Sequence, residues 1–404
     1  MNIYFVTTEF LNKEKNGLLD GGVANEYYKF AKQLIKFGHN VKIIVCTAKR
    51  KQKYNFDGIQ VIELNPRKYF KIIRLLIFYV KKLFHKELRQ MSAKRYLFLD
   101  GINKFLFIES LFNRIDIVQY TSDYRIGVFP LKRIPSCLRI ASYTKNFLLE
   151  YGHADDKVAI KEEKLLYNNT RFIFGPSKFI ANMIKEDLNL KQDIKIIETP
   201  FLKSTMDLNY EYAEKLKNKE YVLFFGTLGV LKGCFDVAEV IYRILKENKD
   251  LHFVFVGKQI EYNNILPINY IKEKAAEYSN RVIYFDKIQH KYLYPLIQNA
   301  SFCLMPSRTE NFSNTCLEAM GFGKTVIGSE PFFNQIITDG VNGFLCKAKD
   351  PDSIYEKVCE VLNLSSEQKE NIEKNALKRI NECAPEDKTK ELVEYYKYVI
   401  NNWK

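Results

Sequence analysis

Short apolar runs alternate with longer amphipathic stretches along most of the chain. The runs are rich in β-branched and aromatic residues and predict strands at residues 3–7, 41–46, 115–119, 139–142, 172–174, 221–225, 252–256, 281–284, 302–305 and 325–327. Stretches of helical length lie between them, the first at about 24–37, closed by Gly38. This alternation is typical of βαβ units, so the sequence predicts an α/β protein built on parallel sheets.

A second strand-loop-helix series begins near Tyr221 and predicts a second α/β domain. At 404 residues the chain is long enough for two domains. We expect an N-terminal domain at 1–200, a C-terminal domain at 201–384 and a long helix at 385–404, with the polar stretch 199–220 as the linker.

Charge divides the chain into two unequal halves. Residues 1–200 hold 35 Lys and Arg against 20 Asp and Glu, a net +15, whereas residues 201–404 hold 27 against 28, a net −1. The asymmetry indicates an anionic surface that one domain meets. No nucleic-acid-binding motif accompanies the basic residues, so we do not expect a nucleic-acid partner.

The eight cysteines are scattered, without a C-x-x-C pair or a Cys/His cluster. This pattern indicates neither a zinc site nor a disulfide framework, and reduced thiols in the cytoplasm are the expectation. The first residues resemble a strand rather than a signal peptide, and no apolar run approaches the roughly 18 residues of a membrane span.

Residues 67–95 interrupt the βαβ rhythm with a basic amphipathic segment. On a helical projection, its basic residues fall within an arc of roughly 140°: Arg67, Lys68, Lys71, Arg74, Lys81, Lys82, Lys86 and Arg89. Apolar residues lie mostly opposite, with Glu87 among them. Such a helix is typical of a segment lying on an anionic membrane face, and the alternative is a domain helix whose apolar face is in the core.

The segment from Glu310 to Glu318 carries the clearest chemistry. Two carboxylates bracket seven small, polar or apolar residues, Asn-Phe-Ser-Asn-Thr-Cys-Leu, and Ala-Met-Gly-Phe-Gly-Lys-Thr-Val-Ile follows. The pattern predicts a loop that turns into a helix, whose N-terminus would favour a phosphate. One carboxylate precedes the helix and the other lies about two turns away, so both can hold one extended ligand.

This segment resembles the retaining nucleotide-sugar glycosyltransferases of family 4, which have the GT-B fold. Four further stretches resemble that family in the expected order, over about residues 1–360: Gly21-Gly22-Val-Ala, Phe37-Gly38-His39-Asn40-Val41, Phe224-Phe-Gly-Thr-Leu-Gly-Val-Leu-Lys232-Gly233 and Ile337-Thr-Asp-Gly-Val-Asn-Gly343. The resemblance implies two Rossmann-like domains facing each other across a cleft, an acceptor-binding N-terminal domain, a donor-binding C-terminal domain, and a final helix that returns to the N-terminal domain.

The resemblance also implies a role for each matching residue. Glu318 would bind the ribose hydroxyls of the donor, because two carboxylate oxygens match a vicinal diol. Glu310 would contact the transferred sugar. Residues at the phosphate would be Ser313, Asn314, Thr315, Lys232, Gly21 and Gly22. No metal ion or other cofactor is expected, because cations and amides would meet the leaving-group charge.

Two positions depart from the family pattern. Thr227 stands where an Arg usually partners the Lys, and Lys145 stands where a His is often found. Asp123, Asp20 and Glu9 are other polar residues near the expected cleft, and none of them is assigned as a general base.

The resemblance therefore implies a metal-independent glycosyltransferase that moves a sugar, with UDP as the expected donor nucleotide, to a hydroxyl of a glycan or lipid-linked acceptor, at the cytoplasmic membrane face. A glycosyltransferase-like scaffold that has lost catalysis is the alternative, supported by Thr227 and Lys145. An epimerase with the same fold is a third reading.

Overall fold

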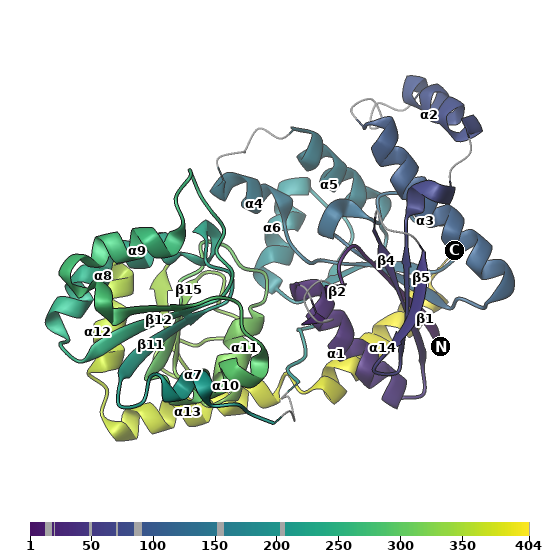
Figure 1. Ribbon diagram of the computed structural model, residues 1–404. Coiled ribbons are helices and arrows are strands. Elements are labelled where there is room, and N and C mark those ends of the chain that lie inside the picture. Colours follow the sequence, from purple (N-terminus) through teal and green to yellow (C-terminus); the bar gives the residue numbers. More distant parts are fainter. Residues whose placement is uncertain are drawn as a thin grey trace. The chain divides into compact units, whose positions relative to one another are not determined.

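The computed structural model describes residues 1–12, 18–19, 21–47, 51–69, 72–84, 91–151, 157–202 and 207–403. The chain divides into two compact units (Figure 1). One contains Met1–Pro200 together with Pro385–Lys404, and the other contains Phe201–Ala384. Each is described by itself below, as the N-terminal unit and the C-terminal unit.

The N-terminal unit is built on an eight-stranded sheet with the order β10-β9-β8-β7-β1-β4-β6-β5. Its strands are β1 (Asn2–Thr7), β4 (Asn40–Cys46), β5 (Gln52–Phe56), β6 (Ile59–Leu64), β7 (Ile117–Thr121), β8 (Ser136–Arg139), β9 (Ile173–Gly175) and β10 (Ile194–Ile196). A separate antiparallel pair joins β2 (Leu11–Asn12) and β3 (Leu18–Leu19). The helices are α1 (Gly22–Lys36), α2 (Ile72–Phe84), α3 (Ala93–Phe112), α4 (Thr144–Glu150), α5 (Lys157–Asn169), α6 (Lys178–Leu188) and α14 (Pro385–Asn401), with 3-10 turns η2 (Pro66–Tyr69) and η4 (Asp123–Arg125).

The final helix packs on the N-terminal unit, as the fold class predicts. Leu392 and Tyr396 of α14 join the core formed by β1, β4 and α1, and Figure 1 shows α14 beside α1. The Tyr396 hydroxyl donates to Gln119 on β7, and Trp403 Nε1 donates to the Lys132 carbonyl at 2.8 Å. These contacts tie the last 20 residues to the first 200.

A buried ion pair marks where the chain leaves this unit. Arg139 at the end of β8 pairs with Glu26 on α1, and both side chains are almost fully buried. Thr199 Oγ1 donates to the same Glu26 carboxylate at 3.2 Å and is itself buried. The expected linker 199–220 therefore begins in packed structure, and it also contains the short helix α7 (Glu211–Glu214).

The C-terminal unit is built on a six-stranded parallel sheet with the order β13-β12-β11-β14-β15-β16. The strands are β11 (Glu220–Phe225), β12 (Leu251–Val256), β13 (Val282–Phe285), β14 (Phe302–Met305), β15 (Val326–Glu330) and β16 (Phe344–Lys347). The remaining elements are α8 (Cys234–Glu247), α9 (Pro267–Ala275), α10 (His290–Asn299), α11 (Asn314–Gly321), α12 (Pro351–Leu362) and α13 (Ser366–Asn381), with 3-10 turns η5 (Val230–Lys232) and η6 (Ala276–Arg281). Numbered along the chain, the order is 3-2-1-4-5-6, which is the doubly wound order of dinucleotide-binding folds.

Helices cover both faces of this sheet because its central strand is apolar on both sides. Tyr221, Leu223 and Phe225 of β11 join the core that packs under α10, α11 and α13. Val222 and Phe224 point the other way and join the core under α8, α9 and α12. Successive side chains of a strand alternate between faces, so one apolar run supplies two cores.

Three expectations from the sequence need correction. β8 lies at Ser136–Arg139, not at 139–142. Residues 67–95 do not form one helix, because η2 ends at Tyr69, α2 covers Ile72–Phe84 and α3 begins only at Ala93. Of the eight basic residues, Arg67 and Lys68 lie on η2 and Arg74, Lys81 and Lys82 on α2, whereas Lys71, Lys86, Glu87 and Arg89 lie outside the described residues. The hairpin β5–β6 was not foreseen.

Candidate functional site

The strand order of the C-terminal unit predicts a ligand crevice at the carboxyl ends of β11 and β14. These strands are neighbours, yet the chain leaves β11 toward β12 on one side and leaves β14 toward β15 on the other. Loops that diverge in this way leave a gap at the sheet edge, and ligands of doubly wound sheets bind there. The two loops, residues 226–233 and 306–313, contain four of the positions singled out from the sequence, namely Thr227, Lys232, Glu310 and Ser313.

An ion pair joins these loops. The Lys232 ammonium contacts the Glu310 Oε2 atom, and the two side chains are 31% and 14% exposed. The other carboxylate oxygen, Oε1, accepts the Asn311 backbone N–H at 3.1 Å. The structure thus brings together a cation and a carboxylate that lie far apart in the sequence and leaves the cation partly open to solvent.

Arg308 fixes the two loops against each other, a role the sequence did not reveal. Its backbone N–H donates to the Leu231 carbonyl at 2.9 Å. Its guanidinium forms two hydrogen bonds with Asp236, at 2.7 and 2.5 Å, and Asp236 is only 4% exposed in the first turn of α8. Arg308 therefore contacts the chain on both sides of Lys232. Two hydrogen bonds between one guanidinium and one carboxylate restrict the orientation of both side chains more than a single ion pair does.

Gly233 allows the close approach of the loops. Its φ is +74°, and a Cβ built there would lie 2.0 Å from the Pro306 carbonyl oxygen. Only glycine combines that backbone conformation with that space. Arg308 and Gly233 together set the distance between Lys232 and Glu310.

The N-terminus of α11 lies at this expected crevice, directly after the loop 306–313. Ser313 is the N-cap, and its hydroxyl accepts the Cys316 N–H at 3.3 Å and lies 3.0 Å from Thr315 Oγ1. Asn314 and Thr315 begin the helix. Gly226, at the end of β11, lies against Thr315, since a Cβ built on it would meet the Thr315 methyl at 3.4 Å. The positive end of α11 thus points to the carboxyl edge of the sheet, as an anion site requires.

Glu318 lies on α11 and has a partner that the sequence did not suggest. His290 Nε2, at the start of α10, lies 3.4 Å from Glu318 Oε1, and the carboxylate is 15% exposed against 43% for the imidazole. The His290 ring lies 5.3 Å from the Tyr294 ring, and Tyr294 packs on Phe322. Burial, with a smaller contribution from the Glu318 charge, raises the pKa of Tyr294, so its hydroxyl stays neutral. One Glu318 oxygen is thereby oriented, while the side chain remains accessible.

Comparison with known proteins gives a family match over the C-terminal unit. Residues 219–364, which contain every C-terminal position above, match the family described as glycosyl transferases group 1. An uncharacterized glycosyltransferase of Methanocaldococcus jannaschii is 24% identical over 98% of both chains. Two others from that organism are each 26% identical, but the chain spans only about half of their length, 51% and 57%.

Solved structures extend the likeness to the whole fold. Sucrose-phosphate synthase from Thermosynechococcus elongatus superposes with a TM-score of 0.78 over 99% of both chains, at 14% identity. Anabaena HepE, solved with UDP and glucose, superposes with a TM-score of 0.68 over 98% of both chains, also at 14% identity. The chain thus has the GT-B fold, and residues 219–364 match a glycosyltransferase family.

The first departure of this chain from the family pattern is visible in the C-terminal unit. Thr227 is exposed directly after Gly226, in the position where an Arg was expected. The two loops do contain a guanidinium, that of Arg308, but it comes from the opposite loop and is bound to Asp236. Arg308 positions the Lys232 loop. The Thr227 side chain is uncharged and cannot replace the charge of the expected Arg.

Lys145, the second departure, is held in a local network of the N-terminal unit. Its ammonium lies 2.7 Å from Asp187, which also accepts the Tyr143 hydroxyl at 2.8 Å. Burial alone would raise the pKa of Asp187, but the hydrogen bonds from Lys145 and Tyr143 lower it overall. Lys145 is 42% exposed, so it remains accessible at the start of α4.

The glycine loop of the N-terminal unit faces a carboxylate. Gly21 is the N-cap of α1 with φ +98°, and a Cβ there would lie 2.3 Å from Glu9 Oε1. The same oxygen accepts the Val23 N–H at 3.1 Å. Glu9 therefore occupies the position at the start of α1 that the sequence assigned to phosphate near Gly21 and Gly22. Asp20 lies outside the described residues.

Asp123 marks the carboxyl end of β7, the neighbour of β1. Burial raises the pKa of its carboxyl group, and the two residues after it, Tyr124 and Arg125, have φ values of +48° and +49°. Non-glycine residues in this conformation carry backbone strain, which often accompanies function. The carboxyl edge of the N-terminal sheet thus holds two acidic groups, Glu9 and Asp123.

No metal site emerges from the described part of the chain, in which no three His, Cys, Asp or Glu side chains converge. The chain does contain one Asp-x-Asp sequence, Asp350-Pro-Asp352. Asp350 is the N-cap of α12 and accepts the Ser353 N–H at 3.0 Å, so the pair serves a helix terminus.

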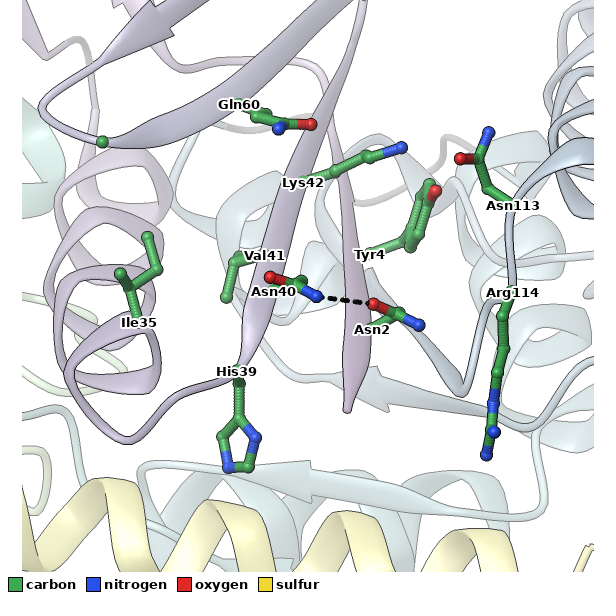
Figure 2. Close-up of a pocket in the computed structure, with 11 residues that line it drawn as sticks. Asn2, Tyr4, Ile35, His39, Asn40, Val41, Lys42, Gln60, Asn113 and Arg114 are labelled. Carbon is green, nitrogen blue, oxygen red and sulfur yellow. Dashed lines mark hydrogen bonds between the residues drawn. The ribbon is translucent and has the colours of Figure 1, made fainter.

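A polar hollow of about 440 Å³ lies at the opposite edge of the N-terminal sheet (Figure 2). Asn2, Asn40 and Lys42 line it at the amino ends of β1 and β4, with Asn40 donating to Asn2 at 3.0 Å. Lys42 is neutralised by Glu109 at 3.0 Å. Ligands of parallel sheets bind at the carboxyl edge, so this hollow is not the candidate site.

Proposed function

We propose that this protein is a glycosyltransferase that transfers a sugar from a nucleoside diphosphate donor to an acceptor hydroxyl, with retention of the anomeric configuration. The observation that carries the proposal is the Lys232–Glu310 pair beside the N-terminus of α11, at the switch point of the C-terminal sheet. A cation and a helix N-terminus suit a diphosphate, and a carboxylate beside them suits sugar hydroxyls.

The donor would lie across the crevice with its ribose at Glu318 and its diphosphate at Ser313, Asn314, Thr315 and Lys232. The base we propose is uracil, supported by the structure of HepE with UDP and glucose. Glu318 has one oxygen oriented by His290 and the other available to a ribose hydroxyl. The acceptor would be a glycan or lipid-linked hydroxyl.

In the proposed reaction, the bond between the anomeric carbon and the diphosphate oxygen breaks, and its electron pair stays on the phosphate. The acceptor oxygen forms the new bond on the same face of the sugar, and its proton passes to the leaving phosphate. Lys232 and the α11 N-terminus would stabilise the charge that develops on the leaving group. Positioning of the substrates and electrostatic stabilisation of the leaving group would account for the rate acceleration, without a metal ion or a protein nucleophile.

A catalytically inactive scaffold is the second candidate, favoured by Thr227 and by the engagement of Lys145 with Asp187. The two are separated by Lys232→Ala and Glu310→Ala, tested with a panel of nucleotide-sugars in a reconstituted system that contains the other components of the transfer reaction. Loss of transfer in both variants supports the enzyme. Transfer that survives both substitutions supports the scaffold.

Product analysis without an acceptor separates transfer from epimerisation. Release of nucleoside diphosphate with free sugar is expected for a transferase that uses water slowly. Recovery of an isomeric nucleotide-sugar would point instead to an epimerase.

A further inference from the structure

Helix α2 exposes the apolar stripe that an amphipathic helix normally buries. Leu76, Tyr79, Val80 and Leu83 have the i, i+3, i+4, i+7 spacing of one helical face, and they are 63%, 56%, 55% and 71% exposed. In a globular domain such a face packs on the core. This observation contradicts the simple alternative, in which the apolar side of the segment lies in the protein interior.

The helix is held to the domain through its other side. Phe78 is fully buried and stacks on Tyr96 of α3, with ring centroids 4.7 Å apart. Phe78 lies between the positions of the exposed stripe and points away from it, and Figure 1 shows α2 beyond α3 at the periphery of the N-terminal unit. The stripe therefore faces outward from a helix that is itself anchored.

Positive charge flanks the stripe. Lys81 is exposed and Lys82 is half-buried over the Phe78 ring, while Arg67 and Lys68 are exposed on the preceding turn η2. Residues 67–89 contain eight basic residues and one acidic residue. An apolar stripe bordered by cations is complementary to a surface that has an anionic outer layer over an apolar interior.

We propose that α2 docks this protein on an anionic lipid bilayer, with Leu76, Tyr79, Val80 and Leu83 in the acyl boundary and the basic side chains at the phosphate level. An amphipathic helix of this composition lies in the plane of the interface. At 13 residues, α2 is about 20 Å long, less than the hydrocarbon thickness of a bilayer. Among the described residues, no helix has the length and apolarity needed to cross a membrane.

A second copy of the chain fits the stripe less well than lipid does. Two copies would bring two basic surfaces together, and like charges at an interface oppose association. Docking on lipid would place the protein beside a lipid-linked acceptor, a consequence that rests on the proposed transferase function. The docking itself requires no nucleotide.

Co-sedimentation of the full chain with vesicles tests the proposal. The probes are vesicles of phosphatidylcholine alone and vesicles with about one third phosphatidylglycerol, in low and in high salt. The test variant is Leu76→Ser/Val80→Ser/Leu83→Ser. The matched control is Ile265→Ser/Val341→Ser/Leu377→Ser, which changes three exposed apolar residues of the C-terminal unit. All six positions are on the surface, and thermal melting verifies that both variants are folded.

We expect the wild type and the control to bind the anionic vesicles, and salt to weaken binding. The stripe variant should lose more than about tenfold in partition coefficient, because three apolar side chains leave the interface. Unchanged binding of the stripe variant, equal binding to both vesicle types, or no binding by the wild type would overturn the proposal. A dimer of the wild type that the stripe variant converts to a monomer would assign the surface to a second copy.

Because no donor is present, failure of the vesicle assay leaves the proposed transferase function untouched. Conversely, loss of transfer in Lys232→Ala leaves the membrane surface intact. The two proposals therefore fail separately.

Discussion

The Lys232 ammonium contacts the Glu310 carboxylate across two loops that are 78 residues apart in the sequence. Each group thus neutralises the other at the place where the proposed function puts a diphosphate and a sugar. A bound diphosphate would take over the ammonium and leave the carboxylate for sugar hydroxyls. The pair is therefore a ground-state arrangement that a donor can exchange for its own contacts.

Removing the Lys232 charge should lower turnover more than donor affinity. We expect Lys232→Ala to reduce kcat by about 10²-fold or more, because the cation acts on charge that develops as the leaving group departs. Initial rates of nucleotide release measure this. Lys258→Ala, an exposed lysine in the loop after β12, is the matched control and should stay near the wild-type rate. A Lys232→Ala rate close to the control would contradict the assignment.

Arg308 and Asp236 should act as one unit. Arg308→Ala and Asp236→Asn each break the paired hydrogen bonds, so each should lower kcat, with a loss of stability of about 2 kcal/mol for a partly buried pair. The double variant should cost little more than either single change, because only one interaction is lost. Arg308→Lys should not restore activity, since an ammonium cannot form the fork.

A double-variant cycle on kcat and on melting temperature measures this coupling. Strictly additive effects in both readouts would show that Arg308 and Asp236 act independently. In that case the account of how the Lys232 loop is positioned would be wrong.

Alanine substitutions at Gly233 and Gly340 distinguish the effect of backbone conformation from the effect of loop spacing. Both have positive φ, +74° and +70°, but a Cβ at Gly340 meets no atom within 4 Å, whereas one at Gly233 overlaps the Pro306 carbonyl. Gly340→Ala should cost only the conformational strain, about 1 kcal/mol. Gly233→Ala should cost more and should also lower kcat, because the loops must separate. Equal effects of the two substitutions on melting and on turnover would refute this spacing argument.

The Lys145–Asp187 contact predicts a pH-dependent contribution to stability. The folded pKa of Asp187 is lowered, so its contribution is present above the unfolded pKa of about 3.9 and is lost as pH falls through the folded pKa. Asp187→Asn should therefore lower the melting temperature at pH 7, modestly, since Lys145 is more than a third exposed. The difference from wild type should shrink below about pH 4. A difference that grows on acidification would have the wrong sign.

The buried strands of the C-terminal unit could be predicted closely from the sequence. The expected strand 302–305 is β14, and that at 221–225 differs from β11 by one residue. Strands buried on both faces read as continuous apolar runs, which composition reveals directly. The position predicted for β8 was wrong for two reasons. Ser136 and Cys137 are as typical of a turn as of a strand, and an arginine such as the buried Arg139 is usually expected on the surface.

The hairpin β5–β6 does have a local signal in the sequence. Asp57-Gly58 lies between two extended runs, and both residues have positive φ, as a two-residue hairpin turn requires. Arg308 and His290 had no such signal. Their partners, Asp236 and Glu318, are 72 and 28 positions away, so only the folded sheet brings them together. Sequence motifs located the groups that would touch a ligand, whereas the residues that position them depend on tertiary structure.

Donor binding tests the central claim most directly. Isothermal titration of the wild type, Glu318→Ala and Glu370→Ala with UDP-, GDP- and ADP-sugars compares a crevice carboxylate with an exposed one on α13. We predict that the wild type and Glu370→Ala bind UDP-sugars and that Glu318→Ala binds at least about tenfold more weakly, because a charged hydrogen bond to ribose is lost. Failure of the wild type to bind any nucleotide-sugar, or undiminished binding by Glu318→Ala, would contradict the account.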